Sequence, residues 1–170
     1  VGGNSLIPSP TAGVFVNIAN DLNITGNTNT TFVNSDVNIN FTQIIVARKL
    51  NDRFSVQVAP SAAYFNAVPR YSDTTGYKNF NLGVSAGLKA NIAGDHNVIL
   101  EYTQLLTKQD LDEQPKPNLA FGWEKSTATH TFQLFVANYN QVINQRNMVF
   151  NSNDFTKGDY LFGFNVIVRF

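Results

Sequence analysis

The chain has 170 residues, enough for one domain with its own core, and no shift in composition along it indicates a second domain. Lys plus Arg equals Asp plus Glu at 12 each, which gives neither the basic excess expected of a nucleic-acid-binding protein nor an acidic tail. Charged residues make up 14 % of the chain, against about 25 % in an ordinary soluble domain, and neutral polar residues such as Asn, Thr and Ser take their place.

Eight segments alternate apolar and polar residues with the period of two that is typical of a β-strand with one apolar face. In chain order they are 14–19, 37–48, 54–64, 79–89, 98–102, 119–123, 132–136 and 160–170. Residues 98–111 also fit an amphipathic helix through Ile99, Tyr102 and Leu106, so that alternative stays open. Pro60 lacks the N–H that a ladder hydrogen bond needs, which predicts a bulge or a local edge in the third strand.

The connections between these segments alternate in length. Short turns are expected at 50–53, 91–97 and 125–129, and long polar loops at 21–35, 66–78, 105–117 and 139–157. In an up-and-down antiparallel sheet this alternation places all short turns at one end and all long loops at the other. The sequence therefore predicts an all-β fold, an antiparallel up-and-down barrel with at least eight strands in this chain.

The composition of the two strand faces decides between a soluble and a membrane barrel. A soluble barrel turns its apolar face inward, whereas a membrane barrel turns it toward lipid and fills its interior with polar groups. The polar face here is mostly Asn, Gly, Ser, Ala, Thr and Gln, and the apolar face has almost no charge in mid-strand, with Gln43 and Gln104 as its polar exceptions. This pattern favours a transmembrane barrel, and a soluble lipocalin-like ligand-binding barrel is the alternative.

Aromatic residues gather near the expected strand ends, as they do at the two lipid interfaces of a membrane barrel. Those expected near the long loops are Tyr64, Tyr77, Phe80, Tyr139, Tyr160 and Phe162, and those near the short turns are Phe54, Trp123 and Phe170.

A membrane barrel with this alternation has a predictable lumen. The residues expected to face it are Asn38, Asn40, Gln57, Asn79, Asn81, Glu101, Glu124, Gln133, Asn165 and Arg169. Glu101, Glu124 and Arg169 are the charges expected in this set, and an ion pair between Arg169 and one glutamate would offset their burial. In a barrel of only eight strands side chains fill the interior, which favours a plugged or very narrow lumen over an open pore.

The last strand keeps its alternation to the final residue. Its apolar positions are Tyr160, Phe162, Phe164, Val166, Val168 and Phe170, and they resemble the C-terminal signal that the insertion machinery recognises in bacterial outer-membrane barrels. Closure of the barrel would remove the sheet edge and pair the backbone N–H groups that hydrocarbon cannot satisfy.

Three stretches together resemble a Bacteroidota family of outer-membrane β-barrels of unknown function: "IIVARKLNDRFSVQVAPSAAYFN", "HTFQLFVANYNQVINQ" and "KGDYLFGFNVIVRF". In that family an A-R-K-hydrophobic-N unit before a short turn and a terminal GD-x-x-FGFN strand recur. The resemblance implies the outer membrane of a Gram-negative bacterium, periplasmic or outer-membrane protein partners, and further strands before the position of Val1. Residues 1–10 are accordingly expected to be an N-terminal periplasmic segment or a link to such strands, and residues 11–170 to be the barrel.

Motifs for catalysis and cofactor binding are not found in the sequence. It has no cysteine, no G-x-S-x-G, no P-loop and no H-E-x-x-H. His96 and His130 each adjoin a short turn. Two separate histidines at the membrane interface are the favoured interpretation, and a metal-binding pair is the alternative. Asp110, Asp112 and Glu113 could hold Ca²⁺, although the stretch lacks the Gly turn of a dedicated loop. We therefore expect that the chain has no enzymatic activity, binds no cofactor and has no metal site.

These observations predict an integral outer-membrane barrel that acts as a scaffold or accessory subunit or as a narrow channel. Because the terminal Phe170 would lie at the periplasmic rim, the short turns at Asn51, Gly94 and Thr127 are expected to face the periplasm. The long loops around Gly26, Thr74, Pro115 and Asn151 are expected to face outward.

Overall fold

The computed structural model describes residues 11–21, 37–140 and 144–168, with the side chains described from Asn40 onward. The strands are β1 (Thr11–Asp21), β2 (Val37–Lys49), β3 (Phe54–Phe65), β4 (Phe80–Ala93), β5 (His96–Leu105), β6 (Asn118–Ser126), β7 (His130–Ala137) and β8 (Leu161–Val168). Two short helices, α1 (Asn144–Phe150) and the 3₁₀ helix Phe155–Lys157, lie between β7 and β8.

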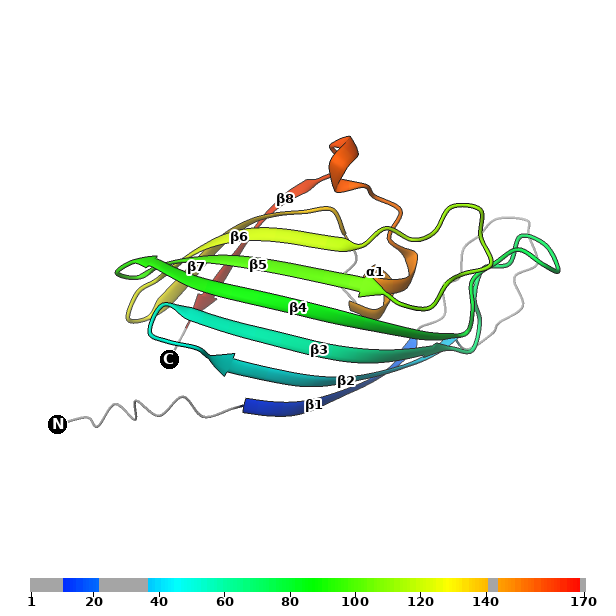
Figure 1. Cartoon of the computed structure of the whole chain (residues 1–170), viewed down its shortest axis with the longest axis horizontal. Coiled ribbons are helices and arrows are strands. Elements are labelled where there is room, and N and C mark those ends of the chain that lie inside the picture. Colours follow the sequence, from blue (N-terminus) through cyan, green and yellow to red (C-terminus); the bar gives the residue numbers. More distant parts are fainter. Residues whose placement is uncertain (1–10, 22–36, 141–143, 169–170) are drawn as a thin grey trace.

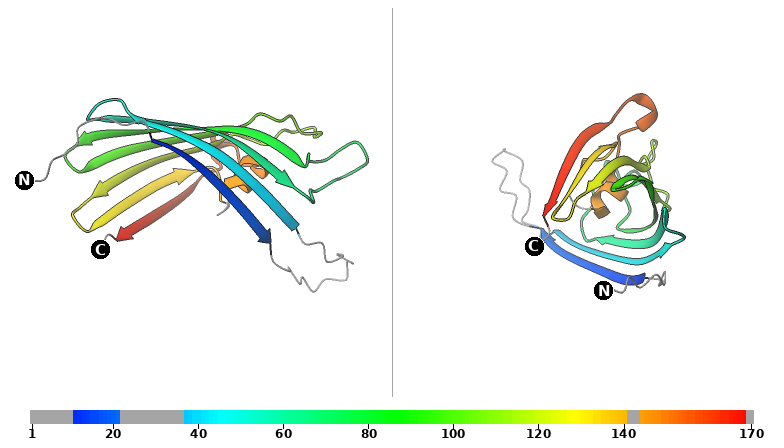
Figure 2. Two further views of the ribbon diagram at one scale, coloured as in Figure 1. Left: turned by 90° about the horizontal axis from the view of Figure 1, so that it is seen from below. Right: turned by 90° about the vertical axis from the view of Figure 1, so that its left-hand side faces the viewer.

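All the strands belong to one antiparallel sheet in which each strand pairs with its neighbour in sequence, from β1 to β8 (Figure 1). The predicted all-β, antiparallel, up-and-down fold is confirmed. β5 occupies the segment that also fitted a helix, so the alternative helix over residues 98–111 is wrong. The predicted closure is not seen, because β1 and β8 form the two edges of the sheet and are not paired with each other. The sheet instead curls into an open trough (Figure 2).

The three short turns lie together at one end of the sheet, as predicted, and the β3–β4 and β5–β6 loops lie at the other (Figure 1). The long loop expected around Gly26 lies outside the described residues. The Asn51 side chain shapes the β2–β3 turn by accepting hydrogen bonds from the backbone N–H groups of Arg53 and Phe54, at 2.9 and 2.8 Å. Gly94 has a φ of 50° in the β4–β5 turn, a backbone conformation that favours glycine. The Thr127 backbone N–H closes the β6–β7 turn by donating to the His130 carbonyl at 2.7 Å.

Pro60 interrupts one ladder without shifting its register. On the β4 side Pro60 is paired with Val84 within an unbroken run of partners. On the β2 side the pairing stops after Gln43↔Ser61 and resumes in the same register at Val46↔Val58. The prediction of a bulge or a local edge at Pro60 is confirmed in its second form, the local loss of pairing. The register shift of the sheet occurs between Asn91 and Ala93, beside the β4–β5 turn.

The two faces of β2 are oriented opposite to the prediction: Phe41, and not Asn40, faces the concave side. Phe41 is paired with Ala63, and both are buried on the concave side of the sheet, with 5 % and 1 % of their surface exposed. Asn40 is exposed and paired with Tyr64 on the convex side, so its predicted place in the lumen is wrong. The cause is α1, whose apolar residues lie inside the trough and give Phe41 something to pack against.

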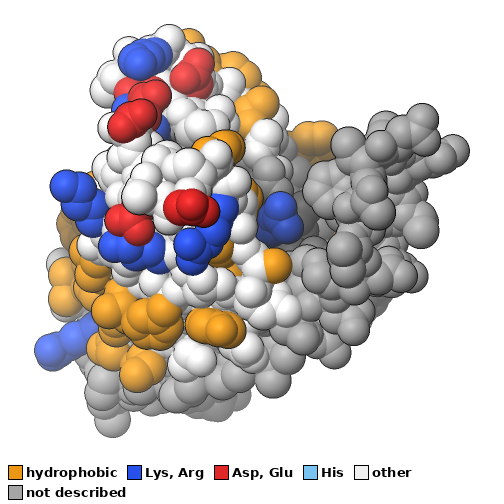
Figure 3. Space-filling view, turned by 90° about the vertical axis from the view of Figure 1, so that its right-hand side faces the viewer, with side chains coloured by type: hydrophobic (Ala, Val, Ile, Leu, Met, Phe, Trp, Pro, Cys, Tyr) orange, Lys and Arg blue, Asp and Glu red, His pale blue; other side chains and the backbone are white. Residues whose placement is uncertain are grey.

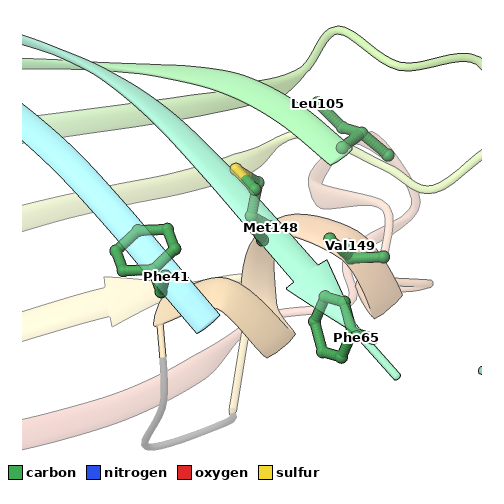
Figure 4. Packing of buried hydrophobic residues seen from close by; sticks show 6 residues of the cluster. Phe41, Phe65, Leu105, Met148 and Val149 are labelled. Carbon is green, nitrogen blue, oxygen red and sulfur yellow. The ribbon is translucent and has the colours of Figure 1, made fainter. Parts of the chain in front are cut away.

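Helix α1 was predicted as part of a long loop and is the main element inside the trough (Figures 1 and 2). Met148 and Val149 of α1 pack against Phe41 of β2, Phe65 of β3 and Leu105 of β5 (Figure 4). Phe65 also makes an edge-to-face contact with Phe150, with ring centroids 5.2 Å apart. The apolar core of the described chain is therefore a small cluster between α1 and the sheet, at the long-loop end.

Candidate functional site: the concave face

The concave face of the sheet carries a polar network centred on Glu124 of β6, whose residue surface is only 5 % exposed. The Lys89 ammonium donates to Glu124 Oε1 at 2.6 Å, and the amides of Asn97 and Gln133 donate to its two oxygens at 3.1 and 2.8 Å. Asn165 of β8 extends the network by donating to Gln133 Oε1 at 3.3 Å. Five strands, β4 to β8, thus contribute to one arrangement, and it neutralises the buried carboxylate.

A cavity of about 380 Å³ lies between α1 and strands β2 to β5. Its wall is formed by apolar side chains such as Phe41, Ile99 and Met148 and by polar ones that include Gln57 and Thr103. A second cavity of about 160 Å³ lies against β5 to β8. Ile99, Glu101 and Tyr139 line both cavities, so they stand at the boundary between the two.

Tyr139 follows β7 and reaches back over the concave face. Its hydroxyl donates a hydrogen bond of 3.4 Å to Glu101 Oε2. Burial, followed by the negative charge of Glu101, raises the pKa of Tyr139 to about 12. At neutral pH the phenol therefore keeps its proton and remains a donor toward Glu101.

The convex face is apolar where an ordinary soluble sheet is polar. Its side chains point away from the trough and are 40–82 % exposed; they include Ile44, Val46, Val58, Phe80, Leu82, Leu100, Phe121, Phe132, Leu134, Phe162 and Phe164. Contiguous exposed apolar surface of this extent marks an interaction with another apolar phase. The charges of both signs that Figure 3 shows at the long-loop end lie outside this band, and two of their ion pairs are Lys78–Asp110 and Lys116–Glu113.

Residues 10–170 match the family described as "Membrane bound beta barrel domain (DUF5777)". The chain belongs to this family. No curated protein and no solved structure matches it.

The membrane location and the barrel type predicted from the sequence agree with the family, and a polar concave face with an apolar convex face is the arrangement that a membrane barrel needs. The soluble lipocalin-like alternative, which requires the apolar face inside, is wrong. No helix in the described ranges is long and apolar enough to cross a membrane.

Six of the residues expected in the lumen of this membrane-bound barrel domain lie on the concave face. They are Gln57, Asn81, Glu101, Glu124, Gln133 and Asn165. Asn79 instead precedes β4 and ties the β3–β4 loop together by donating to the Phe65 carbonyl at 2.7 Å. The side chains of Asn38 and Arg169 lie outside the described residues, as does the expected Arg169 ion pair. Glu124 is paired with Lys89, a partner that the sequence reasoning left out.

Two structural features of the concave face were not predicted, for different reasons. Lys89 shares the polar face of its strand with Asn81 and Gly83 by the alternation, but it is absent from the set of residues and charges expected in the lumen. Helix α1 has only seven residues, NQRNMVF, in a segment rich in Asn, and gives no helical period long enough to detect.

The predicted aromatic girdles are supported at some positions and wrong at two. Tyr64, Phe80, Tyr160 and Phe162 are exposed near the long loops, and Phe54 is exposed near the short turns. Tyr77 instead packs on Phe150 of α1, with ring centroids 4.7 Å apart, and Tyr139 lies over the concave face. Both were mistaken for interfacial residues because periodicity cannot show that a loop folds inward.

The polar exceptions on the predicted apolar face also have explanations in the domain. Gln43 faces the concave side and donates to Ser61 Oγ at 3.0 Å. Gln104 stays on the convex side, where the Tyr102 hydroxyl donates to it at 2.7 Å.

The terminal strand exposes its apolar positions on the convex face. Tyr160, Phe162, Phe164, Val166 and Val168 are all exposed, Phe162 and Phe164 at 82 % and 73 %. Phe170 lies outside the described residues. This exposure is what the proposed insertion signal requires, and it remains a prediction.

The weaker metal-site candidates of the sequence have other contacts. The His96 ring lies 5.4 Å from that of Trp123, and His130 Nδ1 is 2.7 Å from Thr129 Oγ1. Asp110 is paired with Lys78, and Glu113 with Lys116. Within the described part of the chain, no group of three or more His, Asp or Glu side chains is placed to hold a metal ion.

Proposed function

We propose that this chain is an integral β-barrel of the bacterial outer membrane whose lumen is occluded by α1, so that it serves as a scaffold or accessory subunit or as a narrow channel. Membership of a membrane-bound barrel family supports the membrane setting. The observation that carries the rest is the position of α1 inside the trough, with Val149 fully buried and Met148 only 3 % exposed.

The contact between α1 and the sheet supports a fixed plug. A Cβ added at Gly83 of β4 would collide with Met148 Sδ and would lie 3.1 Å from its Cγ, so Met148 occupies the space that the missing side chain leaves. Phe65 and Tyr77 pack on Phe150 from two sides of the same helix. The helix is held by apolar contacts on several elements, which makes spontaneous release costly.

We also propose that the protein has no catalytic function. The strongest candidate groups for acid–base chemistry on the concave face are already engaged, with Glu124 bonded to four donors and Tyr139 bonded to Glu101. Periplasmic or outer-membrane proteins are the partners that we propose for such a scaffold.

We further propose that the complete barrel has more than eight strands. A helix with its side chains is about 10–12 Å wide, whereas an eight-stranded barrel is just wide enough for its own side chains. The trough holds α1 and still leaves a cavity of about 380 Å³. A wider barrel accommodates both.

Planar-bilayer recording of the purified protein tests the occlusion. We expect small or no steady conductance from the wild type and a clear increase from Val149→Asp, because a carboxylate in the buried cluster displaces α1. Ser152→Asp, which adds the same charge at an exposed position just after α1, is the matched control and should behave as the wild type. Steady nanosiemens-scale openings from the wild type would refute the occluded lumen.

Cysteine labelling on intact cells tests the outer-membrane location and its sidedness. The chain has no cysteine, so each introduced thiol reports on one position. A membrane-impermeant maleimide should label Thr74→Cys in a long loop and should label Ala128→Cys in a short turn only after the cells are opened. Labelling of Ala128→Cys on intact cells would contradict the proposed orientation.

A further inference from the structure

The larger cavity has an acceptor that nothing in the described chain satisfies. Asn118, at the start of β6, is 5 % exposed and lines the cavity, and its Oδ1 is buried without a hydrogen-bond partner among the described residues. A buried acceptor without a partner is destabilising, so native proteins seldom leave one unless water or a ligand completes its hydrogen bonding. The atom therefore points to a donor that enters the cavity.

A second acceptor lies on the same wall. Glu101 is paired with Ala120 in the β5–β6 ladder, and Asn118 is paired with Thr103, so Glu101 and Asn118 are diagonal neighbours on one face. Such positions are about 7–8 Å apart along the sheet, a separation that one small ligand bridges. The hydrogen bond to Glu101 within the described residues is the one from the Tyr139 hydroxyl, at 3.4 Å.

The charge of the cavity wall is negative once internal pairs are counted. Lys89 also lines the cavity, but its ammonium lies 2.6 Å from Glu124 Oε1 and is neutralised there. Tyr139 donates a hydrogen bond to Glu101 but brings no positive charge. The carboxylate of Glu101 thus remains the uncompensated charge on the described wall.

We propose that this cavity binds a small organic cation, an alkylammonium whose N–H groups reach the Glu101 carboxylate and Asn118 Oδ1. The ammonium supplies the donors and the positive charge, and the apolar wall of Phe41, Ile99 and Met148 takes the hydrocarbon part. The volume of about 380 Å³ falls in the range of small-molecule sites. The site rests on the position of α1 inside the trough, which the proposed occlusion also needs, and it is independent of the proposed membrane location.

Isothermal titration calorimetry of the detergent-solubilised chain tests the proposal with three probes of similar size: n-butylammonium chloride, n-butanol and sodium butyrate. We expect saturable binding of butylammonium alone. Glu101→Gln keeps the shape of the side chain and removes its charge, and it should weaken butylammonium binding at least tenfold. Asn118→Leu should also weaken it, because it removes the acceptor at nearly constant volume.

Asp73→Asn is the matched control, since it makes the same carboxylate-to-amide change in an exposed loop and should leave binding unchanged. Far-UV circular dichroism of every variant confirms that the sheet is intact. Absence of saturable butylammonium binding, equal binding of butanol, or unchanged affinity in Glu101→Gln would each overturn the proposal. Labelling of Ala128→Cys on intact cells would bear on the proposed orientation in the membrane and not on this site.

Discussion

At the scale of single residues, Glu124 shows how a membrane barrel keeps charge in its interior. Its carboxylate lies on the concave face and receives hydrogen bonds from Lys89, Asn97 and Gln133. A buried carboxylate is tolerated only when its oxygens are bonded and its charge is countered. Because the donors come from β4, β5 and β7, the residue also ties together strands that are not neighbours in the sheet.

Glu124→Ala should lower the free energy of unfolding by about 2 kcal/mol, because it leaves the donors of Lys89, Asn97 and Gln133 without their acceptor. Urea titration of the protein in detergent micelles or vesicles, followed by tryptophan fluorescence, measures the effect. Asp52→Ala is the control: Asp52 forms an ion pair of 3.0 Å with Lys49, but both side chains are at least half exposed, so its loss should cost less than about 1 kcal/mol. Equal costs for the two variants would show that Glu124 has no special role.

At the scale of elements, the sequence predicted strands well and their facing less well. A period of two is a local property of the chain, so it identified each strand in the described residues and the short turns between them. Which face turns inward depends on what lies there. The orientation of β2 depends on Phe41, which turns to the concave side and packs against α1, an element more than 100 residues away in sequence.

The same distinction explains the candidate site. Parity correctly grouped Gln57, Asn81, Glu101 and Glu124 on one face, since they sit in mid-strand. It could not find the boundary role of Tyr139 or the cover formed by α1, because both belong to the segment between β7 and β8, whose path is set by tertiary contacts. Sequence periodicity therefore predicts which strand residues form the wall of such a barrel, but not which loop residues and helices fold into its interior.

The β7–β8 pair offers a test of packing between elements. Gly163 is paired with Phe135, and a Cβ added at Gly163 would overlap the Phe135 ring. Gly163→Ala should therefore destabilise the protein by about 1–3 kcal/mol, through crowding on the concave face. Urea titration measures the change in the free energy of unfolding.

Gly87→Ala is the matched control for this substitution. Gly87 also lies on the concave face, but its added Cβ would meet only Gln57 Cβ, at an ordinary contact distance of 3.7 Å. That variant should be neutral or slightly stabilising, because it reduces the freedom of the unfolded chain. If Phe135→Ala does not relieve the cost of Gly163→Ala in the double variant, crowding is not its cause.

At the scale of the whole molecule, the unpaired edges of the sheet at β1 and β8 are unfavourable in a membrane. Unpaired backbone groups of a sheet edge cost several kcal/mol each in hydrocarbon, so a spanning sheet has to close. β1 and β8 are the two edges of the described sheet, and β8 exposes both of its faces, with Leu161 and Ile167 about as exposed as Val166. Direct pairing of β1 with β8 and closure through additional strands are the two ways to satisfy these edges.

Disulfide crosslinking in the membrane separates these two forms of closure. Cysteines at successive positions from 12 to 20 in β1, each combined with Phe164→Cys or Val166→Cys in β8, sample every register of a direct β1–β8 pair. Because we propose that a barrel holding α1 and a cavity has more than eight strands, we expect none of these pairs to crosslink upon oxidation. The positive control is Leu134→Cys with Phe164→Cys, which are ladder partners in β7 and β8 and lie at a separation that a disulfide bridges. The absence of native cysteines makes each band on a non-reducing gel assignable. A disulfide formed in one consistent β1–β8 register would show that eight strands close the barrel and that α1 is accommodated within it.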